Sequence, residues 1–346
     1  MATSAPASIC LLRLSALGDV CNTVPLVRAL QAAWPNTALS WIIGRTEHRL
    51  VQSLPDVEFI VFNKKAGGSA WRDVRRQLRG RQFDVLLHAQ VSARANLLSL
   101  LVRARRRIGF DRQRAREGHG LVINERISAR PFEHQALALR SFAEHLGLPV
   151  NEVERTLPVS ADGLAFARRH QPEAGRSVLI SPASSHAGRN WHATGYAEVA
   201  DWVVKQTGRP VILVGGPSAI ERELGSQIQQ RMTQPVQNLI GQDTLDQALA
   251  MMARAACVIS PDAGPAHFAA AMGTPVVGLY AATWSRRSGP LGSLEHCVDR
   301  YPDAARKFTG KPPEALRWGR RLEHPGVMDL IAAEDVIAKL KPLLGA

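Results

Sequence analysis

Residues 256–280, ACVISPDAGPAHFAAAMGTPVVGLY, place a short helical segment between two apolar runs. ACVIS and PVVGLY are typical of buried strands, and PAHFAAAMG is a helix that ends at a glycine. A strand, a helix and a second strand in this order form a βαβ unit, in which the two strands run parallel. The stretch therefore predicts an α/β protein with a parallel sheet.

The same alternation runs along the rest of the chain. In the first half, strands are predicted at 9–15, 39–44, 58–62 and 84–89, with helices at 27–34, 71–80 and 94–104. In the second half, further strands are predicted at 177–184 and 210–216, with helices at 195–208, 245–255 and 329–344. Residues 151–176 are polar and are expected to connect two domains. We expect an N-terminal domain over 1–160, a second α/β domain over 177–325, and a C-terminal helical segment, 326–346, that packs back on the N-terminal domain.

Composition excludes several classes of protein. The chain has 346 residues and an apolar content of 45%, which suits two globular domains. Its four cysteines form no CxxC pair and no cluster with histidine, so the sequence predicts no metal site and no disulfide framework. The first residues lack the pattern of a secretory signal, and no apolar run could span a bilayer. We therefore expect a cytoplasmic protein.

The positive charge is concentrated in one region. The net charge is +13, and residues 64–116 hold fifteen Lys and Arg against three acids. Such a field favours an anionic partner: a nucleic acid, a phosphorylated lipid surface or a phosphorylated acceptor. Recognised nucleic-acid motifs are absent from the sequence, and few aromatic residues lie among the basic ones, so we expect no nucleic-acid partner.

The segment WRDVRRQLRGRQ, residues 71–82, is expected to form an anion-binding helix face. Its four arginines follow helical spacing, while three apolar residues face inward: Arg72, Arg75, Arg76 and Arg79 against Trp71, Val74 and Leu78. The runs RARRR (103–107) and RQRAR (112–116) add to this charge. NLLSLLVRARRR (96–107) is expected to be a core helix, with a membrane contact as the alternative.

Two stretches carry candidate catalytic or binding groups at predicted strand-to-helix turns. In LLRLSALGDVCNTVPLVRAL (11–30), Asp19 is either a helix N-cap or a base. In residues 256–280, Asp262 could hold sugar hydroxyls and Gly264 could let the backbone approach a phosphate, to which His267 could donate. The alternative is that Asp262 is a cap and His267 a histidine at the edge of the core.

Two further loops offer groups for a diphosphate and a ribose. SPASSHAGRNWHATGY (181–196) carries Ser184, Ser185 and Arg189, and arginine binds phosphate oxygens through a fixed fork. In VGGPSAIERE (214–223), Gly216 follows a strand and Glu221 could hold ribose hydroxyls. This is not a dinucleotide-binding GxGxxG motif, and no such motif occurs elsewhere. Ordinary loops with solvated polar residues are the alternative for both.

Taken together, RLSALGDVCNTVPLVRAL, SPASSHAGRNW and SPDAGPAHFAAAMGTPVVGLY resemble glycosyltransferase family nine, the lipopolysaccharide heptosyltransferases. The resemblance implies a GT-B fold, with two Rossmann-like domains whose parallel sheets face a central cleft. It also implies an inverting transfer without a metal or other cofactor, from ADP-heptose to the Kdo of lipid A. The acceptor would be an anionic phosphorylated glycolipid, and the enzyme would associate peripherally with the cytoplasmic surface of the inner membrane.

The resemblance also implies roles for individual residues. Asp19 falls on the position of the general base. The donor would be bound by Ser184, Ser185, Arg189, Gly216, Glu221, Asp262, Ala263, Gly264 and His267. The acceptor would face the basic region, with Lys64, Lys65, Arg72, Arg75, Arg76 and Arg79 as the expected contacts.

The sequence departs from the family pattern at three places. Ala263 stands where the family has threonine, Arg189 where it has lysine, and Ala281-Ala282-Thr283 where it has Gly-Pro-Thr. A transferase that uses another nucleotide sugar or a later core acceptor therefore remains an alternative. A sugar-nucleotide epimerase of similar fold and a nucleic-acid-binding protein are the alternatives from other classes.

Overall fold

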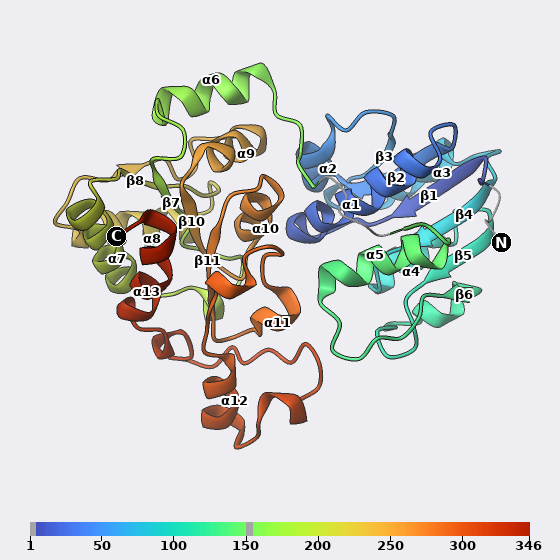
Figure 1. Cartoon of the computed structure of the whole chain (residues 1–346). Helices are drawn as coiled ribbons and strands as arrows, with labels where there is room; N and C mark the ends of the chain where they lie inside the picture. The colour runs from blue at the N-terminus through green and yellow to red at the C-terminus, as the bar shows by residue number, and fades with distance from the viewer. Residues whose placement is uncertain (1–4, 150–154) are drawn as a thin grey trace. The chain divides into compact units, whose positions relative to one another are not determined.

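The computed structural model describes residues 5–149 and 155–346, which form two compact units that divide between Pro158 and Val159. Each unit contains one six-stranded sheet, and the strand pairings found in the described residues are parallel (Figure 1). The prediction of an α/β protein with two parallel sheets is confirmed.

The N-terminal sheet has the strand order β3-β2-β1-β4-β5-β6. Its strands are β1 (Ser8–Leu12), β2 (Ala38–Gly44), β3 (Glu58–Phe62), β4 (Phe83–His88), β5 (Ala104–Gly109) and β6 (Glu125–Arg126). The central strands are apolar on both faces, as in a parallel sheet covered by helices on each side. Ile9, Leu11 and Ile42, for example, are fully buried.

Helices of the N-terminal unit connect these strands. They are α1 (Leu17–Ala33), α2 (Arg45–Val51), α3 (Gly68–Gln77), α4 (Ala93–Ser99) and α5 (Gln135–His145), with the 3-10 turns η1 (Lys64–Ala66) and η2 (His119–Leu121). The helix predicted over 94–104 is too long, because α4 ends at Ser99 and the arginine run continues as β5. In the strand, Arg106 reaches Glu125 of the adjacent β6 at 2.8 Å, a cross-strand ion pair that a helix would not offer.

The C-terminal sheet has the order β12-β11-β10-β7-β8-β9, which repeats the N-terminal topology. Its strands are β7 (Val178–Ile180), β8 (Val211–Leu213), β9 (Gln237–Asn238), β10 (Cys257–Pro261), β11 (Val276–Tyr280) and β12 (Val298–Asp299). The predicted βαβ unit is present, since β10 and β11 pair in parallel and α10 (Gly264–Ala271) connects them.

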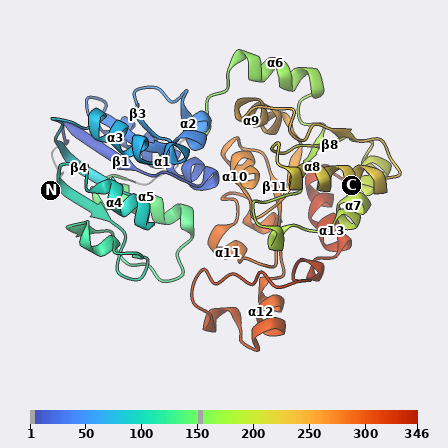
Figure 2. The same cartoon turned by 180° about the vertical axis from the view of Figure 1, so that it is seen from behind.

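The other helices of the C-terminal unit surround its core, and α7 lies beside α8 (Figure 2). They are α6 (Ala161–His170), α7 (Ala193–Thr207), α8 (Ala219–Arg231), α9 (Leu245–Arg254), α11 (Ser285–Ser288), α12 (Tyr301–Thr309) and α13 (Ala333–Leu344). The 3-10 turns are η3 (Ala187–Arg189), η4 (Leu294–His296), η5 (Pro313–Ala315) and η6 (Met328–Leu330).

The segment expected to be a plain connection contains a helix. Residues 151–154 of the predicted 151–176 linker lie outside the described residues, but α6 follows and packs on α9 (Figures 1 and 2). Ser160 caps α6, and its hydroxyl also donates to Asp246 of α9 at 2.5 Å. The segment from Val159 onward is therefore part of the C-terminal unit.

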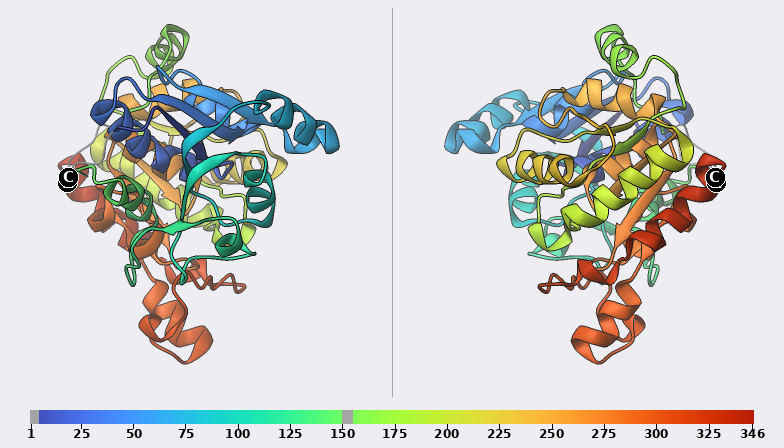
Figure 3. Two further views of the ribbon diagram at one scale, coloured as in Figure 1. Left: turned by 90° about the vertical axis from the view of Figure 1, so that its right-hand side faces the viewer. Right: turned by 90° about the vertical axis from the view of Figure 1, so that its left-hand side faces the viewer.

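The last helix, α13, uses its apolar face within the C-terminal unit. Val336 and Leu340 are fully buried in the core of that unit, and α13 lies beside α7 (Figure 3). The apolar face of α13 thus belongs to the core of the C-terminal unit, and packing of residues 326–346 on the N-terminal domain stays a prediction.

Candidate active site

Strand order indicates where each unit should bind a ligand. In both sheets the order reverses between two neighbouring strands, β1 and β4 in one and β7 and β10 in the other. The loops that leave these strands at their carboxyl ends diverge, and ligands of open α/β sheets bind in the crevice between them. Asp19 follows β1, Arg189 follows β7 and Asp262 follows β10. Three of the residues predicted from the sequence therefore lie at these positions.

Asp19 lies in the first turn of α1, where its carboxylate is held on several sides. It is the third residue of the helix and not the N-cap, which is Ala16. The Oδ2 atom lies 2.5 Å from Nη2 of Arg13 and accepts from the Ala16 N–H at 3.2 Å, while Nε2 of Gln135 donates to Oδ1. Asp19 therefore combines a capping contact with an ion pair, which corrects the simple N-cap interpretation.

Arg13 was not predicted as a site residue, although it interrupts the apolar run of β1. It is 9% exposed, and its Nη1 donates to the carbonyl of Ala89 beyond β4 at 2.5 Å. Its own carbonyl accepts from Nε1 of the buried Trp41 at 3.1 Å. Arg13 thus links the two strands at the reversal and presents a fixed guanidinium to Asp19. A charged residue at the end of a buried strand is the signal that could have identified it.

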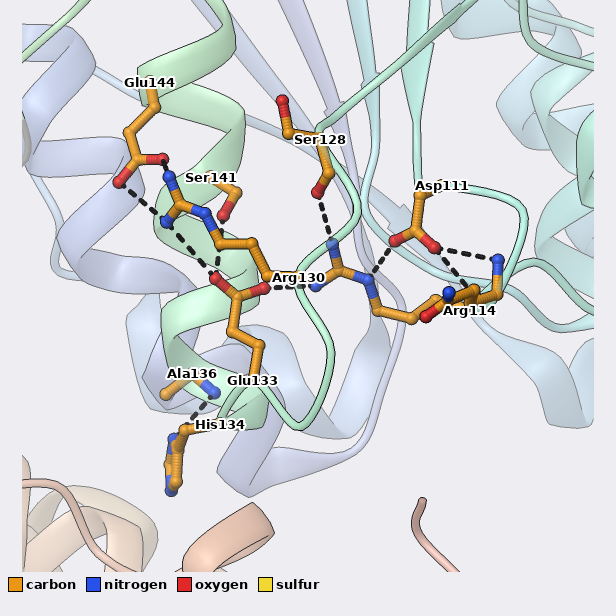
Figure 4. Close-up of polar contacts among 10 residues, drawn as sticks. Asp111, Arg114, Ser128, Arg130, Glu133, His134, Ala136, Ser141 and Glu144 are labelled. Carbon is orange, nitrogen blue, oxygen red and sulfur yellow. Dashed lines mark hydrogen bonds and ion pairs between the residues drawn. The ribbon is translucent and has the colours of Figure 1, made fainter. Parts of the chain in front are cut away.

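Gln135 was also missed, and an ionic network fixes the segment before it (Figure 4). Nη1 of Arg114 lies 2.5 Å from Glu133, whose side chain is 6% exposed, and the same guanidinium also pairs with Asp111. Arg130 reaches Glu133 from the other side at 3.4 Å. Arg114 belongs to the run 112–116 that adds to the positive charge of this region, and its guanidinium pairs with carboxylates of the same unit.

A cavity of 290 Å³ opens at the carboxyl ends of β1 to β4. Its charged lining is mostly cationic, and consists of Arg45, Arg49, Lys64, Lys65, Arg94 and the single acid Glu47. Burial raises the pKa of Glu47, and the nearby Lys64 opposes this shift. The two predicted lysines thus line a cavity that suits an anionic group, whereas the three arginines were not predicted.

Three of the four arginines predicted for one helix face lie on α3, which ends at Gln77. Val74 is fully buried and Leu78 is 5% exposed, while Arg72, Arg75, Arg76 and Arg79 are exposed. Arg76 pairs with Asp73 at 2.8 Å, one turn before it. Arg79 lies in the turn after the helix, and none of the four arginines lines the 290 Å³ cavity, so their expected role in acceptor binding stays a prediction.

Arg189 is the central cation at the point where the strand order of the C-terminal sheet reverses. It is 8% exposed and lies between two carboxylates: Nε donates to Glu323 at 2.9 Å, and Nη1 lies 3.5 Å from Asp262. Burial favours a higher pKa for Glu323, but the hydrogen bond and charge of Arg189 outweigh it and the net pKa is lowered. Within the described residues, Nη2 of Arg189 is buried without a hydrogen-bond partner. Glu323 was not predicted, because it is distant in sequence.

The two serines of this loop differ in their surroundings. Ser184 is buried, and its hydroxyl donates to the His186 carbonyl at 2.8 Å, while its N–H donates to Asn190 Oδ1 at 2.7 Å. Ser185 is exposed. Ser184 therefore stabilises the loop that carries Arg189, and Ser185 leaves its side chain at the surface.

The start of α10 lies directly after Asp262. Ala263 is the N-cap, and its side chain makes no capping hydrogen bond to the first turn of the helix. Gly264 and Pro265 open the helix, and His267 is half-buried in its first turn. Such a helix start suits a phosphate oxygen.

Two carboxyl groups from different segments of the C-terminal unit, Glu221 and Asp243, interact electrostatically. Glu221 accepts from the Gly216 N–H at 2.7 Å and from the Ser218 hydroxyl at 2.6 Å, so its present role is to stabilise the start of α8. Asp243, which was not predicted, lies before α9. Burial raises its pKa from 3.8 to about 7, and the negative charge of Glu221 contributes.

Comparison with known proteins identifies the family. A family model described as glycosyltransferase family 9 (heptosyltransferase) matches residues 71–314, most of the chain. The chain belongs to glycosyltransferase family 9. It is 38% identical over 341 residues to the lipopolysaccharide core heptosyltransferase OpsX of Haemophilus influenzae, covering 99% of this chain and 98% of that protein. The chain is therefore an enzyme of a glycosyltransferase family, as the motifs implied.

Solved structures of family 9 members share the fold. A glycosyl transferase family 9 protein from Veillonella parvula has a TM-score of 0.80 at 20% identity, with 98% of this chain and 97% of that chain covered. The E. coli heptosyltransferase WaaC with ADP has a TM-score of 0.74 at 19% identity, with 97% and 99% covered. The expected GT-B class is thus confirmed. Within residues 5–149 and 155–346, no three metal-binding side chains gather, and metal independence stays a prediction.

Proposed function

We propose that this family 9 enzyme transfers heptose from ADP-heptose to the Kdo of lipid A, early in the assembly of the lipopolysaccharide core. The observation that carries the proposal is the Asp19 carboxylate at the reversal of the N-terminal sheet, held by the buried Arg13 at 2.5 Å. A carboxylate in a fixed orientation is suited to accept the proton of an acceptor hydroxyl. The name of its Haemophilus relative, a core heptosyltransferase, supports the same class of reaction.

In this proposal the N-terminal unit binds the acceptor. Kdo carries a carboxylate and lipid A carries phosphates, and the cationic lining of the 290 Å³ cavity offers guanidinium and ammonium groups to such anions. Lys64 and Lys65 contribute to the lining, and the exposed arginines of α3 extend the positive charge beyond it. The excess of cations also favours fast association with an anionic glycolipid.

The C-terminal unit binds the ADP moiety. Arg189 and the N–H groups at the start of α10 would bind the diphosphate, with His267 as a further donor and Ser184 and Ser185 in the same loop. Glu221, after Gly216, would take the ribose hydroxyls, and Asp262 those of the sugar. Because Arg189 is paired with Asp262 and Glu323, binding of a diphosphate requires the guanidinium to exchange at least one of these contacts.

The chemistry is a single displacement with inversion. The acceptor oxygen forms a bond to the anomeric carbon as its proton passes to Asp19. The bond between that carbon and the diphosphate oxygen breaks, and ADP leaves with the electron pair. Positive charge from Arg189 and the helix start would stabilise the developing charge on the leaving diphosphate.

The acceptor is a membrane lipid, so we propose that the enzyme works at the cytoplasmic surface of the inner membrane as a peripheral protein. Among the described residues, no helix is both long and apolar enough to cross a bilayer.

The test is a panel of nucleotide sugars in two assays. We expect thermal stabilisation by ADP-heptose, but not by UDP- or GDP-sugars, and transfer to Kdo-lipid A with inverted anomeric configuration in the product. Stabilisation by another nucleotide class, or transfer only to a heptose-containing core, would instead identify a related transferase with another donor or a later core acceptor. The departures from the family pattern at Ala263 and Arg189 leave that alternative open. Conversion of the donor without an acceptor would indicate an epimerase.

A further inference from the structure

Three leucines of the N-terminal unit are exposed on neighbouring segments. Leu97 in α4 is 58% exposed, Leu100 just after it 61%, and Leu121 in η2 90%. The buried face of α4 is already occupied by Ala95 and Leu98, which are fully buried. Leu97 and Leu100 are three residues apart and so lie on the same outer side. Grouped exposed apolar side chains mark interaction surfaces, whereas single ones are common.

Hydrogen bonds hold the two segments together. Nδ2 of Asn96 donates to the Glu117 carbonyl at 2.7 Å, and the Ala93 N–H donates to the Glu117 carboxylate at 2.5 Å. The Arg107 guanidinium donates to the carbonyls of Val102 and Val122, each at 2.7 Å. These contacts fix the residues on either side of Leu100 and directly after Leu121. Arg107 therefore supports this surface and is not a free anion-binding group, contrary to the expectation for its run.

A buried histidine pair makes the support rigid. Oδ1 of Asn96 lies 2.9 Å from Nε2 of His88 and 3.1 Å from Nδ1 of His119. Both rings are fully buried, and burial lowers the pKa of His88 to about 3 and that of His119 to about 4. Both remain neutral near neutral pH, so this connection between α4 and η2 does not change in the physiological range.

The chain segment that carries the leucines is rich in positive charge. Residues 92–126 contain nine arginines and three acids. Six of the arginines are exposed: Arg94, Arg103, Arg105, Arg112, Arg116 and Arg126. Of the acids, Asp111 and Glu125 are paired with arginine, and Glu117 accepts from the start of α4. Apolar side chains that project from an arginine-rich surface fit the boundary between the phosphates and the acyl chains of an anionic membrane.

We propose that Leu97, Leu100 and Leu121 form a membrane-docking surface that inserts into a bilayer containing anionic lipid. The surrounding arginines then contact the lipid phosphates. The surface is continuous with the cationic cavity, because Arg94, one helical turn before Leu97, lines that cavity. This part of the inference rests on the proposed function: docking would bring the cavity to the head groups of a lipid-linked acceptor.

The experiment measures binding of the full chain to vesicles of phosphatidylcholine alone and with added phosphatidylglycerol. The test variant is Leu97→Ser/Leu100→Ser/Leu121→Ser. The matched control, Leu164→Ser/Ile220→Ser/Leu294→Ser, removes three exposed apolar side chains from the C-terminal unit, where they are 37%, 53% and 38% exposed. We expect the wild type and the control to bind anionic vesicles alike, and the test variant to bind at least about tenfold more weakly.

Second measurements separate this proposal from the proposed function. Turnover with a de-acylated, soluble acceptor should be the same for the test variant and the wild type. If the wild type fails to transfer heptose but binds anionic vesicles through these leucines, the function fails and the docking surface stands. Equal vesicle binding by the test variant, or no binding by the wild type, overturns the docking surface. A wild-type dimer that the three serines dissociate, with vesicle binding unchanged, would assign the leucines to a second copy of the chain.

Discussion

The two units share one strand order, but the central charged group at the point where that order reverses is a carboxylate in one unit and a guanidinium in the other. At the N-terminal reversal, the Asp19 carboxylate receives donors from Arg13 and Gln135. At the C-terminal reversal, the Arg189 guanidinium lies between the carboxylates of Asp262 and Glu323. A shared topology therefore determines where a site forms, and the loop residues determine its chemistry. One unit carries a carboxylate fit to take a proton, and the other a cation fit to bind a leaving diphosphate.

The largest effect is expected when the charge of Asp19 is removed. Asp19→Asn keeps the size of the side chain but removes the proton acceptor, so we expect kcat to fall about 10²- to 10⁴-fold. The measurement is single-turnover transfer from ADP-heptose. Asp56→Asn, at an exposed position of the same unit, serves as the control and should keep full activity. Near-normal turnover by Asp19→Asn would remove it from the role of base.

The counterpart in the C-terminal unit is Arg189. Arg189→Gln removes the cation and should weaken ADP binding about ten- to a hundredfold, because charge-assisted bonds to phosphate are lost. Since the change also leaves two carboxylates without their cation, Arg189→Gln/Glu323→Gln should recover thermal stability without recovering affinity. Unchanged ADP affinity in both variants would exclude Arg189 from the diphosphate site.

Asp243 tests whether negative charge in the C-terminal unit costs stability. Its pKa is raised from 3.8 to about 7, so the folded state favours the protonated form. The stabilising contribution is full below about pH 4 and is lost as pH rises through 7. Asp243→Asn should therefore be more stable than the wild type at pH 8, by on the order of 2–4 kcal/mol, with little difference at pH 4. Thermal unfolding at both pH values checks this, and a pH-independent difference would contradict it.

Gln135 is expected to orient Asp19, because its side-chain amide donates to the Asp19 carboxylate. Gln135→Ala removes a neutral donor, so we expect kcat to fall about three- to tenfold with little change in the KM for ADP-heptose. Gln82→Ala, at an exposed position, is the matched control. Since Gln135 acts through Asp19, it should have no further effect in the Asp19→Asn background. A further decrease there would show a separate role.

The smallest effect is expected from the exposed arginines of α3 and of the turn that follows it. Arg75→Gln/Arg79→Gln removes two exposed charges and should raise the KM for the acceptor about two- to fivefold, with the difference shrinking as salt is added. The measurement is the acceptor KM at low and high ionic strength. A large, salt-independent loss would show that these arginines make close contacts instead.

The sequence was sufficient to predict the parallel α/β architecture, because strand and helix periodicities alternate regularly. It also placed Asp19, Arg189 and Asp262 at strand ends, where turn residues are readable locally. It did not reveal Gln135 or Glu323, because their contacts with Asp19 and Arg189 join residues 116 and 134 positions apart. Arg13 was missed although a charged residue at the end of a buried strand is a local signal. The sequence also overstates how many arginines in these runs are available to an external anion. The carboxylates that pair with Arg106 and Arg114 come from other elements of the fold.

The proposed roles are proton acceptance by Asp19 and diphosphate binding by Arg189. They are tested most directly by calorimetric titration of ADP-heptose into Asp19→Asn and into Arg189→Gln. Both proteins are full-length, and each loses one charge from one unit. We expect Asp19→Asn to bind the donor with wild-type affinity although it does not transfer the sugar, and Arg189→Gln to bind it at least about tenfold more weakly. Loss of affinity in Asp19→Asn with none in Arg189→Gln would contradict these roles.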